Sequence, residues 1–242
     1  MLIQCRDPHY YGAACLDLAS KHGVRAARRR LLFHPHCAAL AIERFDRSPG
    51  GGRLLVQSLA SLLGDDFRVP KPDYRSLAQV SSKRTGKPEA ERIFRQACFN
   101  VAMSMRDDHS KNFAFRIDAE SKWELSPAFD LCPSPGPCGW HTMTIFGTGI
   151  GIGRTHLLKF AQSLGLPKAT AKEGIDQALA APSEFEALAI ALGSQKTGAI
   201  MWAKTFRSIA RELAPVLVAA GHSGAATAPK HGKIIRGQQP QP

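Results

Sequence analysis

Residues 88–131 read PEAERIFRQACFNVAMSMRDDHSKNFAFRIDAESKWELSPAFDL, and this stretch decides the fold. Pro88 suits the first turn of a helix, because the backbone N–H that proline lacks would have no partner within the helix at that position. The segments 112–117 and 122–125 alternate between apolar and polar residues, with a polar turn at 118–121 between them. We therefore predict a buried helix that leads through a short loop into a β-hairpin. The apolar face of the helix repeats about every 3.6 residues, at Ile93, Phe94, Ala97, Cys98, Val101, Ala102 and Met105.

Three polar side chains stand at the two ends of this predicted hairpin. Asp107 and Asn112 lie five positions apart in the loop before it, and Asp130 follows it. A phosphoryl-transfer loop places its proton-accepting carboxylate and one Mg²⁺ ligand at this spacing, and a second carboxylate completes the metal site. Because a hairpin brings its two ends together, we expect all three side chains to converge. Each residue alone is more typical of a cap or turn, but together they indicate an ATP-dependent kinase site that uses Mg²⁺.

The composition sets limits on the class of protein. Of the 242 residues, 44% are hydrophobic and 21% are charged, which is ordinary for a soluble protein of one large or two small domains. There is no apolar run long enough for a membrane span and no secretory signal pattern, so we predict a cytoplasmic protein without a membrane partner. The six cysteines form no Cys-x-x-Cys pair, which favours small apolar roles. The one tight metal-capable cluster, His34, His36 and Cys37, lacks a fourth ligand at a suitable spacing, so a metal site there is disfavoured.

A basic segment lies near the N-terminus of a chain whose formal net charge is +12. It contains Arg25, Arg28, Arg29 and Arg30, which could contact the phosphates of a nucleic acid or the carboxylates of an acidic partner. No aromatic residue is interspersed among these arginines to support base stacking. The simpler interpretation, a solvated helix end and loop, is therefore favoured, and the nucleic-acid interpretation stays open.

The pattern on either side of the central stretch predicts mostly helices. We expect a helix at 8–22 ended by Gly23, a strand at 38–45, a turn at 48–52 and a helix at 54–63 ended by Gly64. Residues 65–87 are polar and rich in Pro, Ser, Lys and Arg, and we expect mostly loop. The alternating glycines of 147–153 match no nucleotide-binding pattern, which favours a hairpin turn over a phosphate cradle.

The C-terminal third predicts further helices and then a tail. We expect Thr155 to cap a helix at 155–164, and we expect helices at 170–180, 184–192 and 196–220. From residue 221 the chain is rich in Gly, Ala, Lys, Gln and Pro. The predicted organisation is a helix-and-hinge segment at 1–47, a larger domain at 48–220 and a disordered tail at 221–242. The predicted fold class is α+β and mostly α-helical.

In its ordered set of motifs, the chain resembles the C-terminal part of the HipA-type toxin kinases. The shared motifs are AIERFDR at 41–47, DDHSKNFAF at 107–115 and WELSPAFDLCPS at 123–134, within a resemblance that spans roughly residues 10–218. The resemblance implies a protein-kinase-like C-lobe with a small β-hairpin at its active site. It further implies a serine/threonine kinase of a type II toxin–antitoxin system, with ATP and Mg²⁺ as cofactors. The implied protein substrate is a translation factor such as an aminoacyl-tRNA synthetase.

The resemblance assigns a role to each matching residue. Asp107 corresponds to the catalytic base, and Asn112 and Asp130 correspond to the Mg²⁺ ligands. Glu43 and Phe45 correspond to the hinge that contacts adenine.

His109 and Lys111 match the catalytic loop of the family. There Lys111 would approach the transferred phosphoryl group, and His109 would order the loop by hydrogen bonding.

Some parts of the family pattern are not found. Only 42 residues precede Glu43, where the family has an N-lobe with a Gly-rich loop and a phosphate-binding lysine. Both supply electrostatic stabilisation to phosphoryl transfer, so we expect a separate N-lobe chain and little activity from this chain alone. An antitoxin is a further expected partner, and we expect DNA contact only indirectly through it. Two alternatives stay open: a catalytically inactive family fragment that binds an antitoxin or acts as a decoy, and a basic nucleic-acid-binding module.

Overall fold

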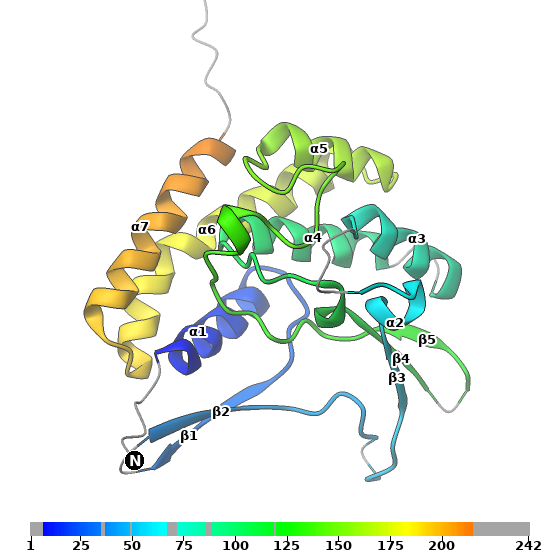
Figure 1. Ribbon diagram of the computed structural model, residues 1–242, viewed down its shortest axis with the longest axis horizontal. Coiled ribbons are helices and arrows are strands. Elements are labelled where there is room, and N and C mark those ends of the chain that lie inside the picture. The colour runs from blue at the N-terminus through cyan, green and yellow to red at the C-terminus, as the bar shows by residue number, and fades with distance from the viewer. Residues whose placement is uncertain are drawn as a thin grey trace, which may run out of the picture.

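The computed structural model describes residues 7–34, 37–48, 50–66, 72–85, 89–118 and 120–214. The tail predicted at 221–242, the predicted helix start at Pro88, and His36 of the possible metal cluster lie outside these residues. Among the described residues, helices predominate and the strands form two small sheets (Figure 1). The predicted class, α+β and mostly α-helical, is confirmed.

The main hydrophobic core forms around helix α4 (Glu89–Ala102), which corresponds to the helix predicted from the central stretch. Its buried face includes Ile93 and Phe94 and packs against α3 (Tyr74–Arg84), α5 (Arg154–Ser163) and α6 (Lys168–Leu192). Full burial of one such side chain stabilises the fold by about 1.5–3 kcal/mol. The helix therefore holds the loop that follows it at a fixed place in the core.

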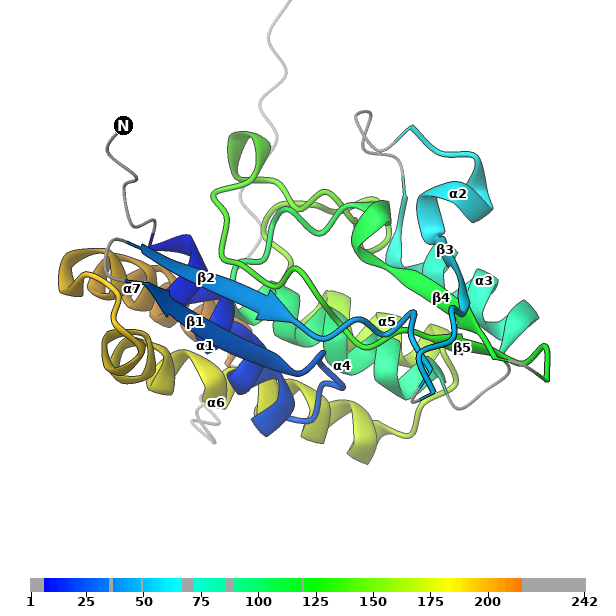
Figure 2. The same cartoon turned by 90° about the horizontal axis from the view of Figure 1, so that it is seen from below.

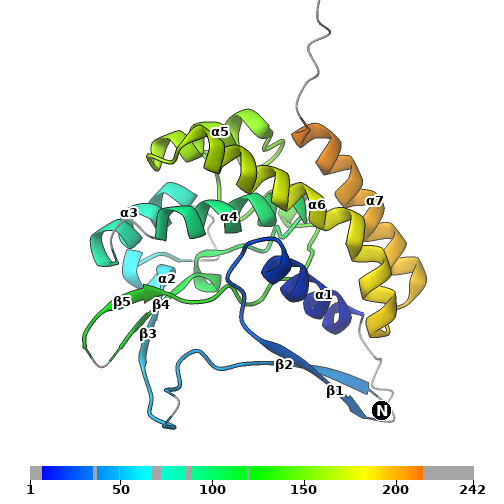
Figure 3. The ribbon, with the colours of Figure 1, turned by 180° about the vertical axis from the view of Figure 1, so that it is seen from behind.

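A second cluster joins the first helix to the last two. Helix α1 (Pro8–Lys21) and α7 (Lys196–Leu213) both pack against α6, as the view from behind shows (Figure 3). Phe185 of α6 lies edge-on to Phe206 of α7, with ring centroids 4.9 Å apart, and 5.8 Å from the ring of Tyr11 on α1. The helix predicted at 8–22 is thus confirmed and is part of the core.

Two details of the predicted C-terminal helices are wrong. The helices expected at 170–180 and 184–192 are one helix, because α6 continues through Pro182. A proline inside a helix removes a backbone hydrogen bond, but the burial of Pro182 and Phe185 on the packed face offsets that cost. Thr155 does not cap α5, since the cap is Gly153, whose N–H donates to Nδ1 of His156 at 3.1 Å.

The strands form two separate antiparallel sheets, seen from below in Figure 2. The first is a hairpin of β1 (Arg29–His34) and β2 (Cys37–Ile42), and β2 is the strand predicted at 38–45. The second contains β3 (Leu55–Ser58), β4 (Ala114–Ile117) and β5 (Trp123–Leu125), in that order. The hairpin predicted around the central stretch is β4–β5 and is confirmed.

The helix predicted at 54–63 is only half right. Its first part is strand β3, which pairs with the outer edge of β4 from Leu55 opposite Ile117 to Ser58 opposite Ala114. The chain then turns into α2 (Leu59–Leu63), where the Ser58 hydroxyl accepts from the N–H of Ser61 at 3.2 Å. Residues 55–58 form a strand because pairing with β4 provides hydrogen-bond partners for the backbone groups on the edge of β4 that β5 does not cover.

The loop predicted at 65–87 is also wrong, because residues 74–84 form helix α3. Asp73 caps this helix by accepting from the N–H of Arg75 at 2.9 Å. The side chains of Tyr74 and Leu77 are fully buried, so packing outweighs the polar composition of the segment. The other Asp73 oxygen accepts from Thr144 Oγ1 at 2.9 Å and from the N–H of Gly147 at 3.0 Å. Asp73 therefore ties α3 to the tight turn at 145–148, which is the hairpin turn predicted from the glycine pattern.

Replacement of Asp73 by alanine should destabilise the protein by about 1–3 kcal/mol at neutral pH, because the cap and the link to the turn are both lost. Burial raises the pKa of Asp73, but its hydrogen bonds to Arg75, Gly147 and Thr144 outweigh burial and hold the pKa below its usual value. The stabilisation is therefore complete above about pH 4 and is lost as the pH falls through the lowered pKa. Urea unfolding at pH 7 and at acidic pH measures both effects, with Glu120→Ala in the β4–β5 turn as the control. A difference between wild type and Asp73→Ala that did not shrink on acidification would contradict this account.

Candidate functional site

The predicted catalytic loop leaves the end of α4 and leads into β4. Ser104 has a φ of 52°, and Met105 pairs with Ser134, so the chain reverses direction directly after the helix. Residues 110–112 then form a short 3₁₀ turn. The Asn112 side chain closes the loop, since its Nδ2 donates to the backbone oxygen of Asp107 at 2.9 Å. The amide oxygen of Asn112 and the carboxylate of Asp107, which is 68% exposed, stay available to a ligand.

The other end of the hairpin brings Asp130 to the same place. After β5, the backbone of Ala128 pairs with the segment 25–27 through two hydrogen bonds of 2.8 Å, which fix the chain just before Asp130. Asp130 itself has a φ of 54°, in the left-handed region that few residues other than glycine adopt. A strained backbone of this kind is common at functional sites, where the surrounding structure holds it in place.

Asp107, Asn112 and Asp130 line a single narrow recess, together with Phe129 and Cys132. The electrostatics of Cys132 agree with this placement. Its pKa is raised to about 11, first by burial and then by the negative charges of Asp130 and Asp107. The convergence expected from the hairpin therefore occurs, although the roles of the three residues stay predictions.

The oxygen atoms at this recess fit a magnesium ion. Mg²⁺ prefers oxygen ligands and is usually held by one or two carboxylates together with phosphates and waters. The amide oxygen of Asn112 and the carboxylate of Asp130 supply two ligands of this kind at the recess. In the part of the chain that the structure describes, no group of three or more His, Cys, Asp or Glu side chains is placed to hold a metal. The recess thus suits an ion shared with a phosphate ligand better than a closed protein metal site.

A larger cavity of about 460 Å³ adjoins Asp130 on the side of the predicted hinge. Ile42, Glu43, Phe45 and Val56 line it together with Phe129, so most of its wall is apolar. The ring of Phe45 lies 5.2 Å from that of Phe129, the residue just before Asp130. The predicted hinge residues Glu43 and Phe45 thus line the same cavity as Asp130, whereas Asn112 lines the recess on the other side of Asp130 and Phe129.

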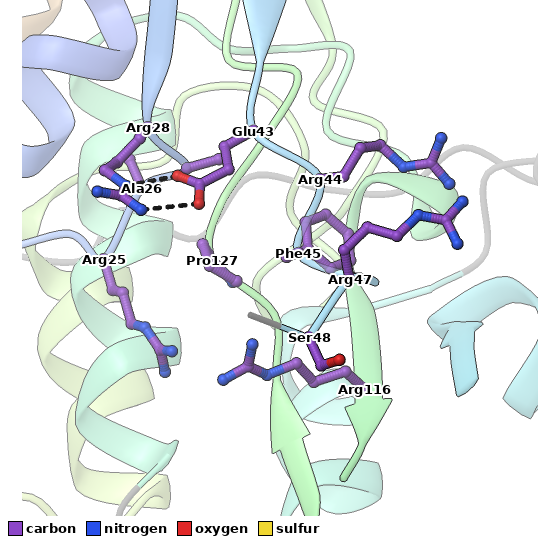
Figure 4. A pocket seen from close by; sticks show the side chains of 11 residues that line it. Arg25, Ala26, Arg28, Glu43, Arg44, Phe45, Arg47, Ser48, Arg116 and Pro127 are labelled. Carbon is purple, nitrogen blue, oxygen red and sulfur yellow. Dashed lines mark hydrogen bonds and ion pairs between the residues drawn. The ribbon is translucent and has the colours of Figure 1, made fainter. Parts of the chain in front are cut away.

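Glu43 is held by an arginine on the far side of the hinge. Arg28 Nε and Nη2 donate to its two carboxylate oxygens at 2.5 and 2.8 Å (Figure 4). This bidentate pair lowers the pKa of Glu43, chiefly through the hydrogen bond from Arg28. Any ligand contact through the Glu43 carboxylate would have to replace this pair.

His109 and Lys111 lie on the same loop as the three converging residues. His109 Nε2 is 3.9 Å from Asp107 Oδ1, which is beyond hydrogen-bond distance, and the imidazole is 20% exposed. The predicted ordering of the loop by a hydrogen bond from His109 stays a prediction. Lys111 is exposed on the 3₁₀ turn beside Asn112. The predicted approach of Lys111 to a transferred phosphoryl group stays a prediction.

Sequence reasoning missed the residue that anchors this loop, Asp108. Its carboxylate is buried, and Oδ1 accepts from the N–H groups of Thr142 and Met143 at 2.9 and 3.1 Å. Oδ2 accepts from the hydroxyl of Tyr74 at 2.8 Å and lies 3.1 Å from Nδ1 of His141. The only sequence signal was the doubled aspartate at 107–108, because every partner of Asp108 is distant in the chain.

The basic segment is largely engaged within the protein. Arg25 pairs with Glu124, Arg28 with Glu43 and Arg29 with Asp17. Three of the four arginines that could have formed a nucleic-acid surface therefore have carboxylate partners. This arrangement weakens the interpretation of the chain as a nucleic-acid-binding module.

The Tyr74→Phe variant should lose about 1–3 kcal/mol of unfolding free energy. It removes one donor to buried Asp108 and also leaves Nδ2 of Asn100, which donates to the Tyr74 hydroxyl at 2.9 Å, without its acceptor. Denaturant unfolding measures the loss, and Tyr10→Phe on α1, whose side chain is partly exposed, is the matched control. A Tyr74→Phe variant as stable as the control would show that the network does not stabilise the loop.

The comparisons with known proteins agree with this geometry. The chain is 32% identical over 98 residues to the protein named Putative kinase Y4dM of Sinorhizobium fredii. The aligned residues cover 40% of this chain and 24% of that protein. Its fold resembles HipA of Shewanella oneidensis MR-1, solved with HipB and operator DNA, at a TM-score of 0.71 and 18% identity. That match covers 85% of this chain and 55% of HipA.

A second solved kinase, CtkA of Helicobacter pylori, matches at a TM-score of 0.60 and 8% identity, over 86% of this chain and 84% of CtkA. The chain thus has a kinase-like fold, and it spans about a quarter of its curated relative and about half of HipA. Among the described residues, no helix is long and apolar enough to cross a membrane. The model of the HipA-like C-terminal domain matches residues 10–185, and the chain therefore belongs to this family.

Proposed function

We propose that this chain is the catalytic C-lobe of an ATP-dependent serine/threonine protein kinase. The observation that supports the proposal most strongly is the common recess of Asp107, Asn112 and Asp130, which adjoins the cavity beside the hinge. Membership of the HipA-like family and the kinase-like fold are consistent with it. A purely structural loop has little need for three oxygen-bearing side chains that converge from both ends of a hairpin.

The proposed reaction transfers the terminal phosphoryl group of ATP to a protein hydroxyl. Asp107 accepts the proton of the serine or threonine hydroxyl, whose oxygen forms a bond to the γ-phosphorus while the bond to the leaving oxygen of ADP breaks. Asn112 and Asp130 would hold Mg²⁺, which neutralises charge on the phosphates when bound. Phe45, Ile42 and Val56 would form the apolar wall against the adenine. His109 would order the loop by hydrogen bonding, and Lys111 would approach the phosphoryl group.

The proposed partners follow from the family and from the HipA neighbour. The Shewanella HipA structure contains HipB and operator DNA, so we include an antitoxin partner, with DNA contact only through that antitoxin. A separate chain would supply the N-lobe with its Gly-rich loop and lysine. The proposed substrate is a protein of the translation machinery such as an aminoacyl-tRNA synthetase, and the proposed location is the cytoplasm.

Mg-ATP should stabilise the purified chain against thermal unfolding. At a ligand concentration 100 times the dissociation constant, the gain is about 2.7 kcal/mol, which corresponds to a rise of roughly 5–10 °C in Tm. Asp130→Asn should lose most of the magnesium-dependent part of this shift, because the variant removes a charged ligand. Asp176→Asn on α6, also a half-exposed carboxylate, is the matched control and should keep the full shift. A chain that Mg-ATP does not stabilise would support the inactive-fragment alternative.

Asp107→Asn should lower phosphoryl transfer by about 10²–10⁴-fold, since the amide cannot accept the hydroxyl proton. The same variant should retain Mg-ATP binding, because Asp107 is not a proposed metal ligand. Transfer of radiolabelled phosphate to protein, measured with the chain and its assembly partners, tests this separation. Equal transfer by wild type and Asp107→Asn would exclude Asp107 as the base.

A further inference from the structure

A second cavity lies along the hinge and shares Glu43, Arg44 and Phe45 with the cavity proposed for the nucleotide. Its volume is about 660 Å³, within the range of small-molecule sites. The loop before β1, the hinge segment and strand β4 form its walls (Figure 4). Its lining contains five arginines, namely Arg25, Arg28, Arg44, Arg47 and Arg116. Asp107, Asn112 and Asp130 do not line this cavity.

The carboxylates around the cavity do not neutralise its arginines. Arg28 pairs with Glu43, while Arg44 and Arg47 share Asp46. Arg25 and Arg116 share a single carboxylate, Glu124. Arg25, Arg28 and Arg116 thus share two carboxylates, Glu43 and Glu124, which leaves one positive charge in excess among these three arginines.

The close view shows which of these groups reach the cavity. The guanidinium groups of Arg25 and Arg116 extend into the space between the loop and β4, and the Ser48 hydroxyl lies beside Arg116 (Figure 4). Arg28 borders the same space from the other side of Glu43, whereas Arg44 and Arg47 extend away from it. Three guanidinium groups and a hydroxyl donor therefore border one cavity from different elements of the fold.

We propose that this cavity is a binding site for a small phosphate monoester, recognised through its doubly charged terminal phosphate. Guanidinium groups donate paired hydrogen bonds that match phosphate oxygens, and several can contact one phosphate group at once. A phosphate monoester carries nearly two negative charges at neutral pH, so it competes better than a singly charged anion with the carboxylates of Glu43 and Glu124 for these arginines.

The same features argue against a nucleic-acid backbone as the ligand. A phosphodiester carries a single charge, and binding of single-stranded nucleic acid also requires aromatic platforms for the bases. Phe45 is the one aromatic residue in the lining, and its ring packs on Phe129. The arginines of the cavity therefore present charge to a compact anion rather than an extended stacking surface.

Glu43 acts as an internal competitor at this site. Its carboxylate engages Arg28 through two hydrogen bonds, so a bound phosphate must share or displace that pair. Removal of the Glu43 charge would free Arg28 and remove repulsion of the anion. Loss of the Glu43 charge should therefore strengthen anion binding, whereas loss of the charge of Arg25 or Arg116 should weaken it.

The test is calorimetric titration of the purified full chain with inorganic phosphate and with O-phosphoserine, at constant ionic strength and without magnesium. Without the metal, the carboxylates of Asp107 and Asp130 repel these probes from the proposed catalytic recess. Arg116→Gln and Arg25→Gln should each weaken binding by about tenfold, the effect of one lost charge-assisted hydrogen bond. Glu43→Gln should strengthen it roughly two- to fivefold. Lys159→Gln on α5, an exposed cation far along the chain, is the matched control and should not change it.

The outcomes separate the alternatives. Binding of both probes with these opposite effects establishes a monoester site, and binding of O-phosphoserine alone would assign it to phosphorylated side chains. Binding of neither probe, or equal affinities in wild type, Glu43→Gln and Arg116→Gln, would overturn the proposal. Tighter binding of an oligonucleotide without terminal phosphates would overturn it in favour of a nucleic-acid site. Glu43→Gln keeps the test decisive even if an arginine variant fails to fold.

Discussion

The buried carboxylate of Asp108 is the constraint on which the geometry of the candidate site depends. An ionised carboxylate is costly to bury unless hydrogen bonds compensate its lost hydration. Two backbone N–H groups and the hydroxyl of Tyr74 supply that compensation, with His141 in contact at 3.1 Å. Tyr74 comes from α3, and the other partners come from residues 141–143, which follow the predicted metal ligand Asp130. A single side chain therefore joins three parts of the fold at the residue next to the proposed catalytic base.

A second restraint fixes the other half of the site. The backbone of Ala128 is hydrogen-bonded to the segment 25–27, which continues into β1 and so into the hinge. Asp130 is two residues further on, in a left-handed conformation that the neighbouring contacts must hold. The predicted catalytic loop and Asp130 are thus anchored to different parts of the chain, and the β4–β5 hairpin sets the distance between them. Preorganisation of this kind is what phosphoryl transfer requires of a protein, since its catalysis consists mainly of positioning and electrostatics.

The sequence was informative where local pattern and tertiary structure agree. The periodicity of α4 and the alternation of β4 and β5 are strong local signals, and together they predicted that Asp107, Asn112 and Asp130 meet. Strand β3 was missed because its four residues become a strand only through pairing with β4. Helix α3 was missed because most of its residues are polar, and two buried side chains, Tyr74 and Leu77, decide its packing. The partners of Asp108 lie 33–35 residues away, beyond the reach of any local pattern.

The hinge contributes to two cavities of different chemical character, and this arrangement follows from a few consecutive residues. Glu43, Arg44 and Phe45 line both the apolar cavity beside Asp130 and the arginine-lined cavity. Phe45 packs on Phe129, whereas Glu43, two positions before Phe45, pairs with Arg28. Because Glu43 and Phe45 are only two positions apart, a displacement of the hinge backbone shifts both side chains. The charge balance of the arginine-lined cavity and the shape of the proposed adenine wall are therefore mechanically coupled.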